Sequence, residues 1–191
     1  IIDPLYIDEI NEIYNLACPA SPLHYQENPI KTIKTCTIGT INILGLAKKN
    51  NAKVLQASTS EVYGKNPNPP WEESFDRVLG PTSIDRWSYS TSKAVCEHML
   101  FALGRTKKLE FTTVRFFNIY GPGQAPIFVA SQSIYKALRN ESPLLYDDGK
   151  QTRCFTYVDD AIEGVIRASH NKNAIGEVFN IGSNVETSMS D

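Results

Sequence analysis

A tyrosine and a lysine lie four residues apart in the segment YSTSK, at Tyr89 and Lys93. On a helix this spacing places both side chains on one face, one turn apart. A lysine so close to a tyrosine stabilises the phenolate, which lets the tyrosine act as a base near neutral pH. The spacing alone is common, and on most helices it marks a solvated face. The motifs around it therefore decide between the two interpretations.

The segment STSEVYG, from Ser58 to Gly64, follows an apolar run that is expected to form a buried strand. Open α/β sheets bind their ligands at the carboxyl ends of their strands. The hydroxyl groups of Thr59 and Ser60 and the carboxylate of Glu61 are thus well placed to contact a substrate. In the alternative interpretation, Thr59 and Ser60 cap the following turn and Glu61 is solvated.

Helical periodicity alternates with short β-branched runs, and this alternation predicts an α/β fold with a parallel sheet flanked by helices. Strands are expected at residues 12–17, 52–58, 109–118 and 177–182, and helices at residues 30–50, 89–105, 128–139 and 159–169. Residues 142–155 are expected to combine short extended pieces with a turn at Asp148-Gly149. The pattern changes at Gly121-Pro122-Gly123, where a second, smaller part of the chain is expected to begin.

The charge balance and the apolar pattern exclude several classes of partner. The 191 residues include 19 basic and 21 acidic side chains, a formal net charge of -2, so no nucleic-acid partner is expected. No run of eighteen apolar residues occurs, so no membrane contact is expected in this segment.

The cysteines indicate the compartment. They are widely spaced, without a Cys-x-x-Cys pair, as is typical of reduced, buried thiols: Cys18, Cys36, Cys96 and Cys154. A reducing compartment, the cytoplasm, is therefore expected. No metal site is predicted, because the histidines have no carboxylate or cysteine at metal-ligand spacing.

Five motifs together resemble a known family. ACPASPLHYQENPIKTIKT, ASTSEVYG, YSTSK, VRFFNIYGPG and DGKQTRCFTYVDD follow the order and spacing of extended short-chain dehydrogenase/reductases that modify nucleotide sugars, the NAD-dependent epimerase/dehydratase family. Within it, the segment from Leu16 to Thr35 looks most like UDP-glucuronate decarboxylases (UDP-xylose synthases). The resemblance implies NAD as cofactor and a doubly wound Rossmann-type domain with a small substrate-binding lobe.

The resemblance also implies a domain plan. Residues 1–120 would form a partial NAD-binding Rossmann domain, residues 121–157 the substrate-binding lobe, and residues 158–191 a helix and strand that return toward the core. A Gly-x-x-Gly-x-x-Gly loop, which would cradle the dinucleotide pyrophosphate, is absent from the sequence. Either the chain is a fragment without its amino-terminal and carboxyl-terminal parts, or it binds no dinucleotide.

Site residues follow from the same resemblance. Tyr89 would be the catalytic base and Lys93 its partner, while Thr59 would pass the proton of the sugar O4 toward Tyr89. The remaining catalytic residues would be Ser60, Glu61 and Arg153. NAD would contact Leu16, Ala17, Pro19, Ser58, Tyr89 and Lys93. The UDP-sugar substrate would contact Tyr25, Thr59, Asn118 and Arg153.

The triplet Thr59-Ser60-Glu61 sorts the reactions within the family. A 4,6-dehydratase must protonate a departing hydroxyl group and typically has an aspartate at the position of Ser60, because serine is far too weak an acid. Decarboxylation needs no such acid, since oxidation at C4 creates a β-keto acid. A decarboxylase is thus favoured, with a 4-epimerase or dehydratase and a non-catalytic binding or scaffold protein as alternatives. Helices 30–50 and 89–105 resemble those that form a dimer interface in this family.

Overall fold

The structure is a computed structural model, and it describes residues 1–145 and 148–190. The chain divides into two compact units. The first unit comprises residues 1–115 and 167–180, and the second comprises residues 116–166 and 181–191. The predicted assignment of a cofactor and a substrate to separate domains stays a prediction.

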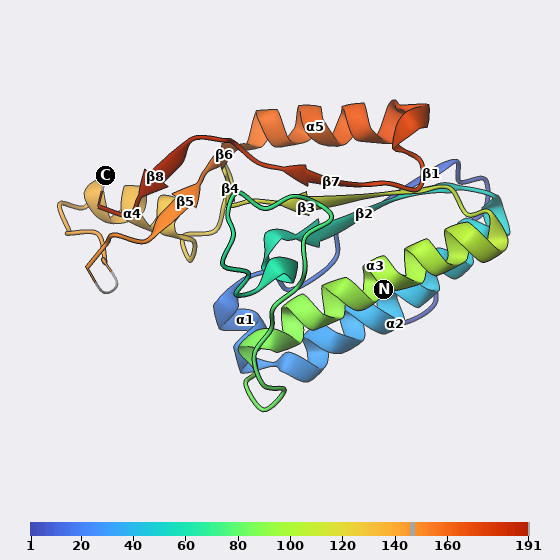
Figure 1. The fold of residues 1–191 in the computed structure, drawn as a ribbon, viewed down its shortest axis with the longest axis horizontal. Coiled ribbons are helices and arrows are strands. Elements are labelled where there is room, and N and C mark those ends of the chain that lie inside the picture. Colours follow the sequence, from blue (N-terminus) through green and yellow to red (C-terminus); the bar gives the residue numbers. More distant parts are fainter. Residues whose placement is uncertain (146–147, 191) are drawn as a thin grey trace. The chain divides into compact units, whose positions relative to one another are not determined.

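A four-stranded sheet in the order β1-β2-β3-β7 organises the first unit (Figure 1). Its strands are β1 (Glu12–Asn15), β2 (Lys53–Thr59), β3 (Phe111–Phe116) and β7 (Val178–Ile181). Strand β1 runs parallel to β2, with Glu12 opposite Lys53. Six of the seven residues of β2 are buried, as expected for a strand covered on both faces. The α/β class with a parallel, Rossmann-type sheet is confirmed.

Two long helices, α2 (Pro29–Asn50) and α3 (Arg86–Lys107), lie side by side on one face of this sheet (Figure 1). Helix α2 begins where the side chain of Asn28 accepts a hydrogen bond from the backbone N–H of Lys31 at 2.9 Å. It ends at Asn51, whose left-handed backbone (φ 54°) stops the helix. Beneath the helices lies an apolar core made of Ile43, Leu44, Ala47, Ala52, Val54, Leu100 and Phe111. The core fixes the strand ends relative to both helices.

Short elements complete the first unit. Helix α1 (Pro22–Glu27) precedes α2, and the 3-10 helix η1 (Ser60–Tyr63) follows β2 directly. A second 3-10 helix, η2 (Lys172–Ala174), precedes β7.

The second unit contains two small sheets. Strand β4 (Ile119–Tyr120) pairs in parallel with β6 (Thr156–Tyr157), and β5 (Thr152–Cys154) pairs antiparallel with β8 (Glu186–Ser188). Helix α4 (Val129–Ala137) belongs to this unit, and helix α5 (Val158–His170) begins in it. Gly121 is required beside α5, because a Cβ there would lie 2.4 Å from Cγ1 of Val158.

All four predicted strands and all four predicted helices are present, with ends shifted by a few residues. The predicted strand 109–118 is shorter in the structure, since β3 ends at Phe116 and Asn118 adopts a left-handed backbone (φ 39°). In the segment 142–155, Asp148-Gly149 lies in a turn, while residues 146 and 147 lie outside the described part of the chain.

Candidate active site

The carboxyl end of β2 places Thr59 at the start of η1. Thr59 is buried, and its Oγ1 accepts a hydrogen bond from the backbone N–H of Glu61 at 3.2 Å, so it does cap the following turn. The same side chain also forms a hydrogen bond with Tyr89. The cap and the contact with Tyr89 therefore coexist, and the cap holds Thr59 in position for that contact.

Tyr89 lies in the first turns of α3 and is 6% exposed. Its ring stacks on the ring of Tyr25, with centroids 5.0 Å apart and planes 2° from parallel. Burial raises the pKa of Tyr89, and a negative charge on Cys18 raises it further, whereas the hydrogen bond with Thr59 lowers it. Ionising this phenol therefore requires added positive charge nearby.

Lys93 follows Tyr89 by one turn of α3 and is 3% exposed. Its Nζ donates a hydrogen bond to the backbone carbonyl of Ala57, near the carboxyl end of β2, at 2.9 Å. This bond fixes the ammonium group beside the strand end that carries Thr59. The charge of Lys93 also lowers the pKa of the thiol of Cys18.

Glu61 forms an ion pair with Arg86, at 3.2 Å between Oε2 and Nη2. Both side chains are partly exposed, so the carboxylate faces solvent and remains able to contact a ligand. Arg86 was missed by the sequence analysis. The signal was present, because Arg86 precedes Tyr89 by three residues and so shares its helix face.

Three buried hydroxyl groups of the first unit have no hydrogen-bond partner within the described part of the chain, those of Ser21, Tyr25 and Thr113, and the first two lie at helix α1. Tyr25 is 1% exposed, and burial raises its pKa to about 12. An unpartnered buried hydroxyl costs about 1–3 kcal/mol, so a ligand that bonds to it would recover this energy. We call Ser21, Tyr25, Thr59 and Tyr89 the hydroxyl cluster. Its open hydroxyl groups fit the polar substituents of a sugar or a nicotinamide ribose.

The segment after β1 holds the predicted cofactor contacts Leu16, Ala17 and Pro19. Leu16 is 60% exposed, and Ala17 is also exposed, so both are available to a ligand. The backbone N–H of Ala17 donates to Oδ1 of the buried Asn15 at 3.4 Å, which fixes the start of the segment. These contacts with the cofactor stay predictions.

A second polar cluster reaches the same end of β2 through Ser58, and hydrogen bonds join its members. Arg115 on β3 contacts Glu97 on α3 through two hydrogen bonds of 2.6 and 3.0 Å, and both side chains are 7% exposed. Arg115 also donates to Oη of Tyr63 at 2.7 Å, and Tyr63 donates to Oδ1 of Asn180 at 2.8 Å. Ser58 donates to Glu97 at 2.5 Å. We call these five residues the Glu97 network.

Ser58 was predicted to contact the cofactor, and its hydroxyl proton is instead used within the Glu97 network. A cofactor contact at Ser58 stays a prediction, since its oxygen can still accept a hydrogen bond. Ser60 is half-buried at the start of η1 and lies between Thr59 and Glu61. The structure thus brings together the predicted residues of the first unit around the end of β2.

Asn118 and Arg153 lie in the second unit. The side-chain amide of Asn118 donates to the backbone carbonyl of Cys154 at 3.2 Å, which links it to β5. Arg153 is exposed on β5, opposite Thr187 of β8, and its Nη1 donates to the carbonyl of Thr152 at 2.7 Å. Within that unit both residues occupy adjoining segments. Their contacts with a substrate stay predictions.

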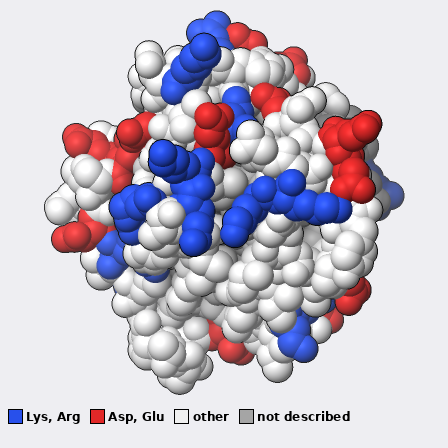
Figure 2. Space-filling model, turned by 90° about the vertical axis from the view of Figure 1, so that its right-hand side faces the viewer, with Lys and Arg blue, Asp and Glu red and all other residues white. Residues whose placement is uncertain are grey.

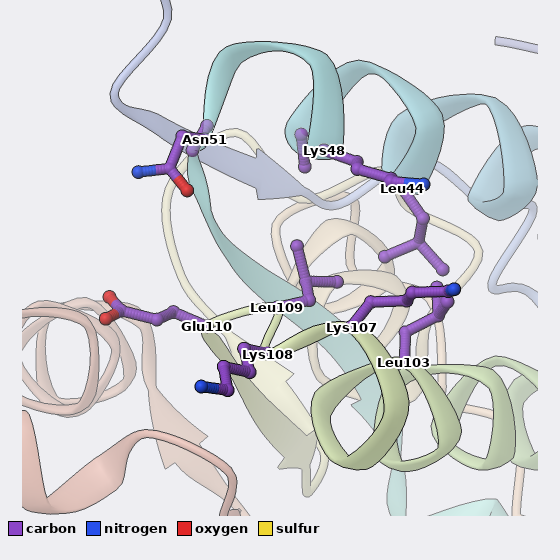
Figure 3. Close-up of a pocket in the computed structure, with 10 residues that line it drawn as sticks. Leu44, Lys48, Asn51, Leu103, Lys107, Lys108, Leu109 and Glu110 are labelled. Atoms are coloured by element: carbon purple, nitrogen blue, oxygen red, sulfur yellow. The ribbon is translucent and has the colours of Figure 1, made fainter.

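A cavity of about 160 Å³ lies at the opposite ends of the strands from Thr59 (Figure 3). It is lined by the last turns of α2 and α3 and by the residues that precede β2 and β3, and Leu44, Leu103 and Leu109 point toward one another across it. Parallel sheets bind ligands at the carboxyl ends of strands, so this cavity is not the candidate active site.

Basic and acidic side chains share the face of the molecule that Figure 2 shows. Lys and Arg gather near its middle, with Asp and Glu toward its edge.

Within residues 1–145 and 148–190, no helix is long and apolar enough to cross a membrane. Over the same residues, no group of three metal-binding side chains is placed to hold a metal ion.

Comparisons with known proteins agree with this geometry. The sequence profile described as the NAD dependent epimerase/dehydratase family matches residues 3–182. UDP-glucuronic acid decarboxylase 3 of Arabidopsis thaliana is 43% identical over 195 residues, which cover 99% of this chain and 55% of that protein. The chain spans about half the length of the curated relatives it matches.

Two solved structures are similar over most of the chain. The PbgP3 protein from Burkholderia pseudomallei has a TM-score of 0.86 and 31% identity, covering 94% of this chain and 57% of that one. UDP-glucuronic acid 4-epimerase from Bacillus cereus, in complex with UDP-glucuronic acid and NAD, has a TM-score of 0.85 and 29% identity, covering 95% of this chain and 57% of that one. The similar proteins thus include one named as a UDP-glucuronic acid decarboxylase and one named as a 4-epimerase.

Proposed function

Because this chain belongs to the NAD dependent epimerase/dehydratase family, we propose that it forms a catalytic part of an enzyme that decarboxylates UDP-glucuronate through a 4-keto intermediate. The observation that carries the proposal is the triplet Thr59-Ser60-Glu61 at the end of β2, because the family resemblance assigns Ser60 to the position where a dehydratase typically has an aspartate. Relatives named as UDP-glucuronic acid decarboxylases support the same reaction.

NAD⁺, when bound, accepts a hydride from C4 of the sugar and later returns it. Leu16, Ala17 and Pro19 would lie along the cofactor, and Lys93 would contact its ribose. Lys93 is suited to this role because its bond to the carbonyl of Ala57 fixes the ammonium group while leaving two further N–H donors.

Tyr89 would remove the proton from the sugar O4 through Thr59, as C4 becomes a ketone. The hydrogen bond between the two side chains provides the path. Since burial raises the pKa of Tyr89, the phenolate depends on positive charge from Lys93 and from an oxidised nicotinamide. The parallel ring of Tyr25 holds Tyr89 in one orientation.

Carbon dioxide would then leave from C5 of the β-keto acid, as the C5–C6 bond breaks and its electron pair moves toward the C4 oxygen. Thr59 and the reprotonated Tyr89 would donate hydrogen bonds to the enolate oxygen, a stabilisation of about 3–4 kcal/mol for one such donor. C5 would take a proton from a water molecule that Glu61 orders, and the ion pair with Arg86 would fix the orientation of Glu61. Alternatively, Arg153 would assist this protonation. Ser60 would face the C5 substituent without supplying a proton.

The substrate would contact Tyr25 and Asn118 in addition to Thr59 and Arg153. The unpartnered hydroxyl of Tyr25 supports the first contact, because a sugar hydroxyl would supply its missing bond. A 4-epimerase is the second candidate function, supported by the similarity to the Bacillus cereus enzyme. An epimerase would keep the carboxylate and return hydride to the opposite face of C4.

We propose a homodimer as the assembly, formed through helices 30–50 and 89–105. Apolar side chains on α2 are exposed at Ile30 (65%), Ile33 (42%) and Ile41 (55%). These positions repeat at helical spacing and form one apolar stripe, which a second copy would cover. Sedimentation of the full-length protein tests this: Ile33→Asp with Ile41→Asp should give a monomer, whereas a wild-type monomer would contradict it.

The cytoplasm is the compartment we propose. All four cysteines are free thiols in the structure, and thiols persist in a reducing compartment. Localisation of the full-length protein by fluorescence microscopy tests this placement, and retention in the secretory pathway would contradict it.

Product analysis tests the reaction. The full-length protein is incubated with NAD⁺ and UDP-glucuronate, and released carbon dioxide is measured alongside absorbance from NADH. Carbon dioxide without NADH supports decarboxylation with return of the hydride to give UDP-xylose. Carbon dioxide with NADH supports release of the ketone. Conversion to a UDP-uronic acid epimer without carbon dioxide would overturn the proposal in favour of an epimerase.

A further inference from the structure

Three cysteines that are far apart in the sequence converge beside the candidate active site. Cys18 follows β1, Cys36 lies in α2, and Cys96 lies in α3. The Sγ atoms of Cys18 and Cys36 are 2.8 Å apart, close enough for one thiol to donate a hydrogen bond to the other. All three residues belong to the first unit. This contact was not expected from the sequence spacing.

The surroundings of the three thiols differ. Cys36 is 2% exposed and Cys96 is 1% exposed, whereas Cys18 is only half-buried and can be reached by a dissolved reagent. Cys96 also contacts Cys36, since the two side chains form a hydrogen bond and the Sγ of Cys96 donates to the carbonyl of Cys36 at 3.1 Å, but its buried thiol is closed to such a reagent. Cys18 and Cys36 are thus the pair set to react with each other.

The contact makes the two thiols unequal. The hydrogen bond from Cys36 lowers the pKa of Cys18, and the positive charge of Lys93 lowers it further. The same bond, together with burial, raises the pKa of Cys36 to about 12, although a hydrogen bond with Cys96 lowers it. Reactive cysteines are accessible and have a lowered pKa, and Cys18 combines partial exposure with a lowered pKa and a second thiol 2.8 Å away. Cys36 is then the resolving thiol.

We propose that Cys18 and Cys36 form a redox-active dithiol that closes into a disulfide upon reaction with a small disulfide such as oxidised glutathione. The thiolate of Cys18 attacks one glutathione sulfur, and the first glutathione thiolate leaves. Cys36 loses its proton and attacks the Cys18 sulfur, which expels the second glutathione. Two protein thiols thereby give up two electrons and two protons, and one oxidised glutathione becomes two reduced molecules.

Closing the bond brings the sulfur atoms from 2.8 Å to about 2.05 Å. It also ties the segment after β1 to α2 and removes an ionisable thiol whose negative charge would raise the pKa of Tyr89. If the proposed function holds, this segment contacts NAD through Ala17 and Pro19. The disulfide fixes that segment against α2, so the oxidised protein binds NAD more weakly than the reduced protein.

Mass spectrometry of the full-length protein tests the disulfide without reference to activity. The protein is treated with oxidised glutathione, quenched in acid, alkylated and digested. A peptide that joins Cys18 to Cys36 is expected, with no glutathione attached. The variant Cys36→Ser cannot form this disulfide, so a stable glutathione adduct on Cys18 is expected. The matched control Cys96→Ser should form the Cys18–Cys36 disulfide as the wild type does.

A wild-type protein that keeps glutathione on Cys18, or leaves Cys18 unmodified while Cys154 reacts, would overturn the proposal. The cofactor effect is measured separately by titration calorimetry with NAD. Weaker binding after oxidation in the wild type, but not in Cys18→Ser, which forms neither the disulfide nor the glutathione adduct, supports it. Equal affinity in both wild-type forms would overturn the cofactor effect alone, and failure of the reduced protein to bind NAD would instead count against the proposed function.

Discussion

Two polar clusters meet at the carboxyl end of β2, one through Thr59 and the other through Ser58, and they differ in how their hydrogen bonds are used. In the Glu97 network the carboxylate, the guanidinium of Arg115 and the hydroxyl of Tyr63 bond to one another within the protein. In the hydroxyl cluster, Tyr25 and Ser21 leave buried hydroxyl groups without a partner among the described residues. Both clusters are buried, except that Asn180 of the Glu97 network is half-buried. Burial of polar groups therefore does not by itself distinguish a scaffold from a site.

The difference shows how a fold separates stability from function. The hydrogen bonds of the Glu97 network fix the ends of β2, β3 and β7 relative to α3. A cluster with open hydroxyl groups gives up folding energy, which a ligand recovers on binding. Changes in the Glu97 network should thus affect unfolding, and changes in the hydroxyl cluster should affect chemistry. Four substitutions test this separation, ordered by their expected effect on the free energy of unfolding.

Glu97→Gln should have the largest effect, a loss of about 3–5 kcal/mol in the free energy of unfolding, because it leaves the buried charge of Arg115 without a counter-ion. Urea denaturation of the full-length protein measures this loss, with the exposed Glu110→Gln as a matched control. The double variant Glu97→Leu with Arg115→Met should lose less free energy of unfolding than its two single variants lose together. A loss below about 1 kcal/mol for Glu97→Gln would show that the pair of Glu97 and Arg115 stabilises the fold no more than an ordinary surface ion pair does.

Thr59→Val should lower the free energy of unfolding by about 1 kcal/mol, since it removes the cap of η1. It also removes the hydrogen bond to Tyr89, so the rate of product formation should fall even where the protein is fully folded. Thermal unfolding and steady-state kinetics are measured on one preparation. Wild-type kinetics in this variant would remove Thr59 from the proton path.

Arg86→Gln should change the free energy of unfolding by less than about 1 kcal/mol, because its pair with Glu61 is partly exposed and screened by water. Lys49→Gln, which breaks the surface pair with Asp8, is the matched control for stability. Only Arg86→Gln should also slow the reaction, since Glu61 would lose its fixed orientation. Equal kinetics in the two variants would show that Arg86 has no positioning role.

Tyr25→Phe should have the smallest effect, leaving the free energy of unfolding unchanged or slightly raised, because the hydroxyl it removes has no partner within the described residues. The ring stacking on Tyr89 is retained. The KM for the UDP-sugar should rise, as the proposed substrate contact is lost. A clear loss of stability with an unchanged KM would assign this hydroxyl to the scaffold.

Much of the framework could be predicted from the sequence, because periodicity is a local property. Helices α2 and α3 and strand β2 are long and strongly patterned, and their predicted positions match closely. Helix α1 was missed, since six residues that begin with a proline give little periodicity. Strands β4, β6 and β8 were also missed, because strands of two or three residues depend on a partner that local patterns do not reveal.

The candidate site was predicted in part for the same reason. Thr59 and Tyr89 were found through motifs, each within a few adjacent residues, and their contact follows from the fold. The pairing of Glu97 with Arg115 joins a helix to a strand, and the contact of Cys18 with Cys36 joins a loop to a helix. Such contacts depend on how α2 and α3 pack on the sheet, which no local spacing encodes.

Two buried tyrosines, one from each cluster, provide the most direct test of the separation between site and scaffold. Carbon dioxide release from UDP-glucuronate is measured for full-length Tyr89→Phe and Tyr63→Phe, together with unfolding. Tyr89→Phe should lower the rate by about 10²–10⁴-fold at wild-type stability. Tyr63→Phe should lower stability by about 1–3 kcal/mol and keep the rate, because Arg115 and Asn180 lose a partner outside the site. Equal loss of rate in both variants, or a retained rate in Tyr89→Phe, would contradict the account.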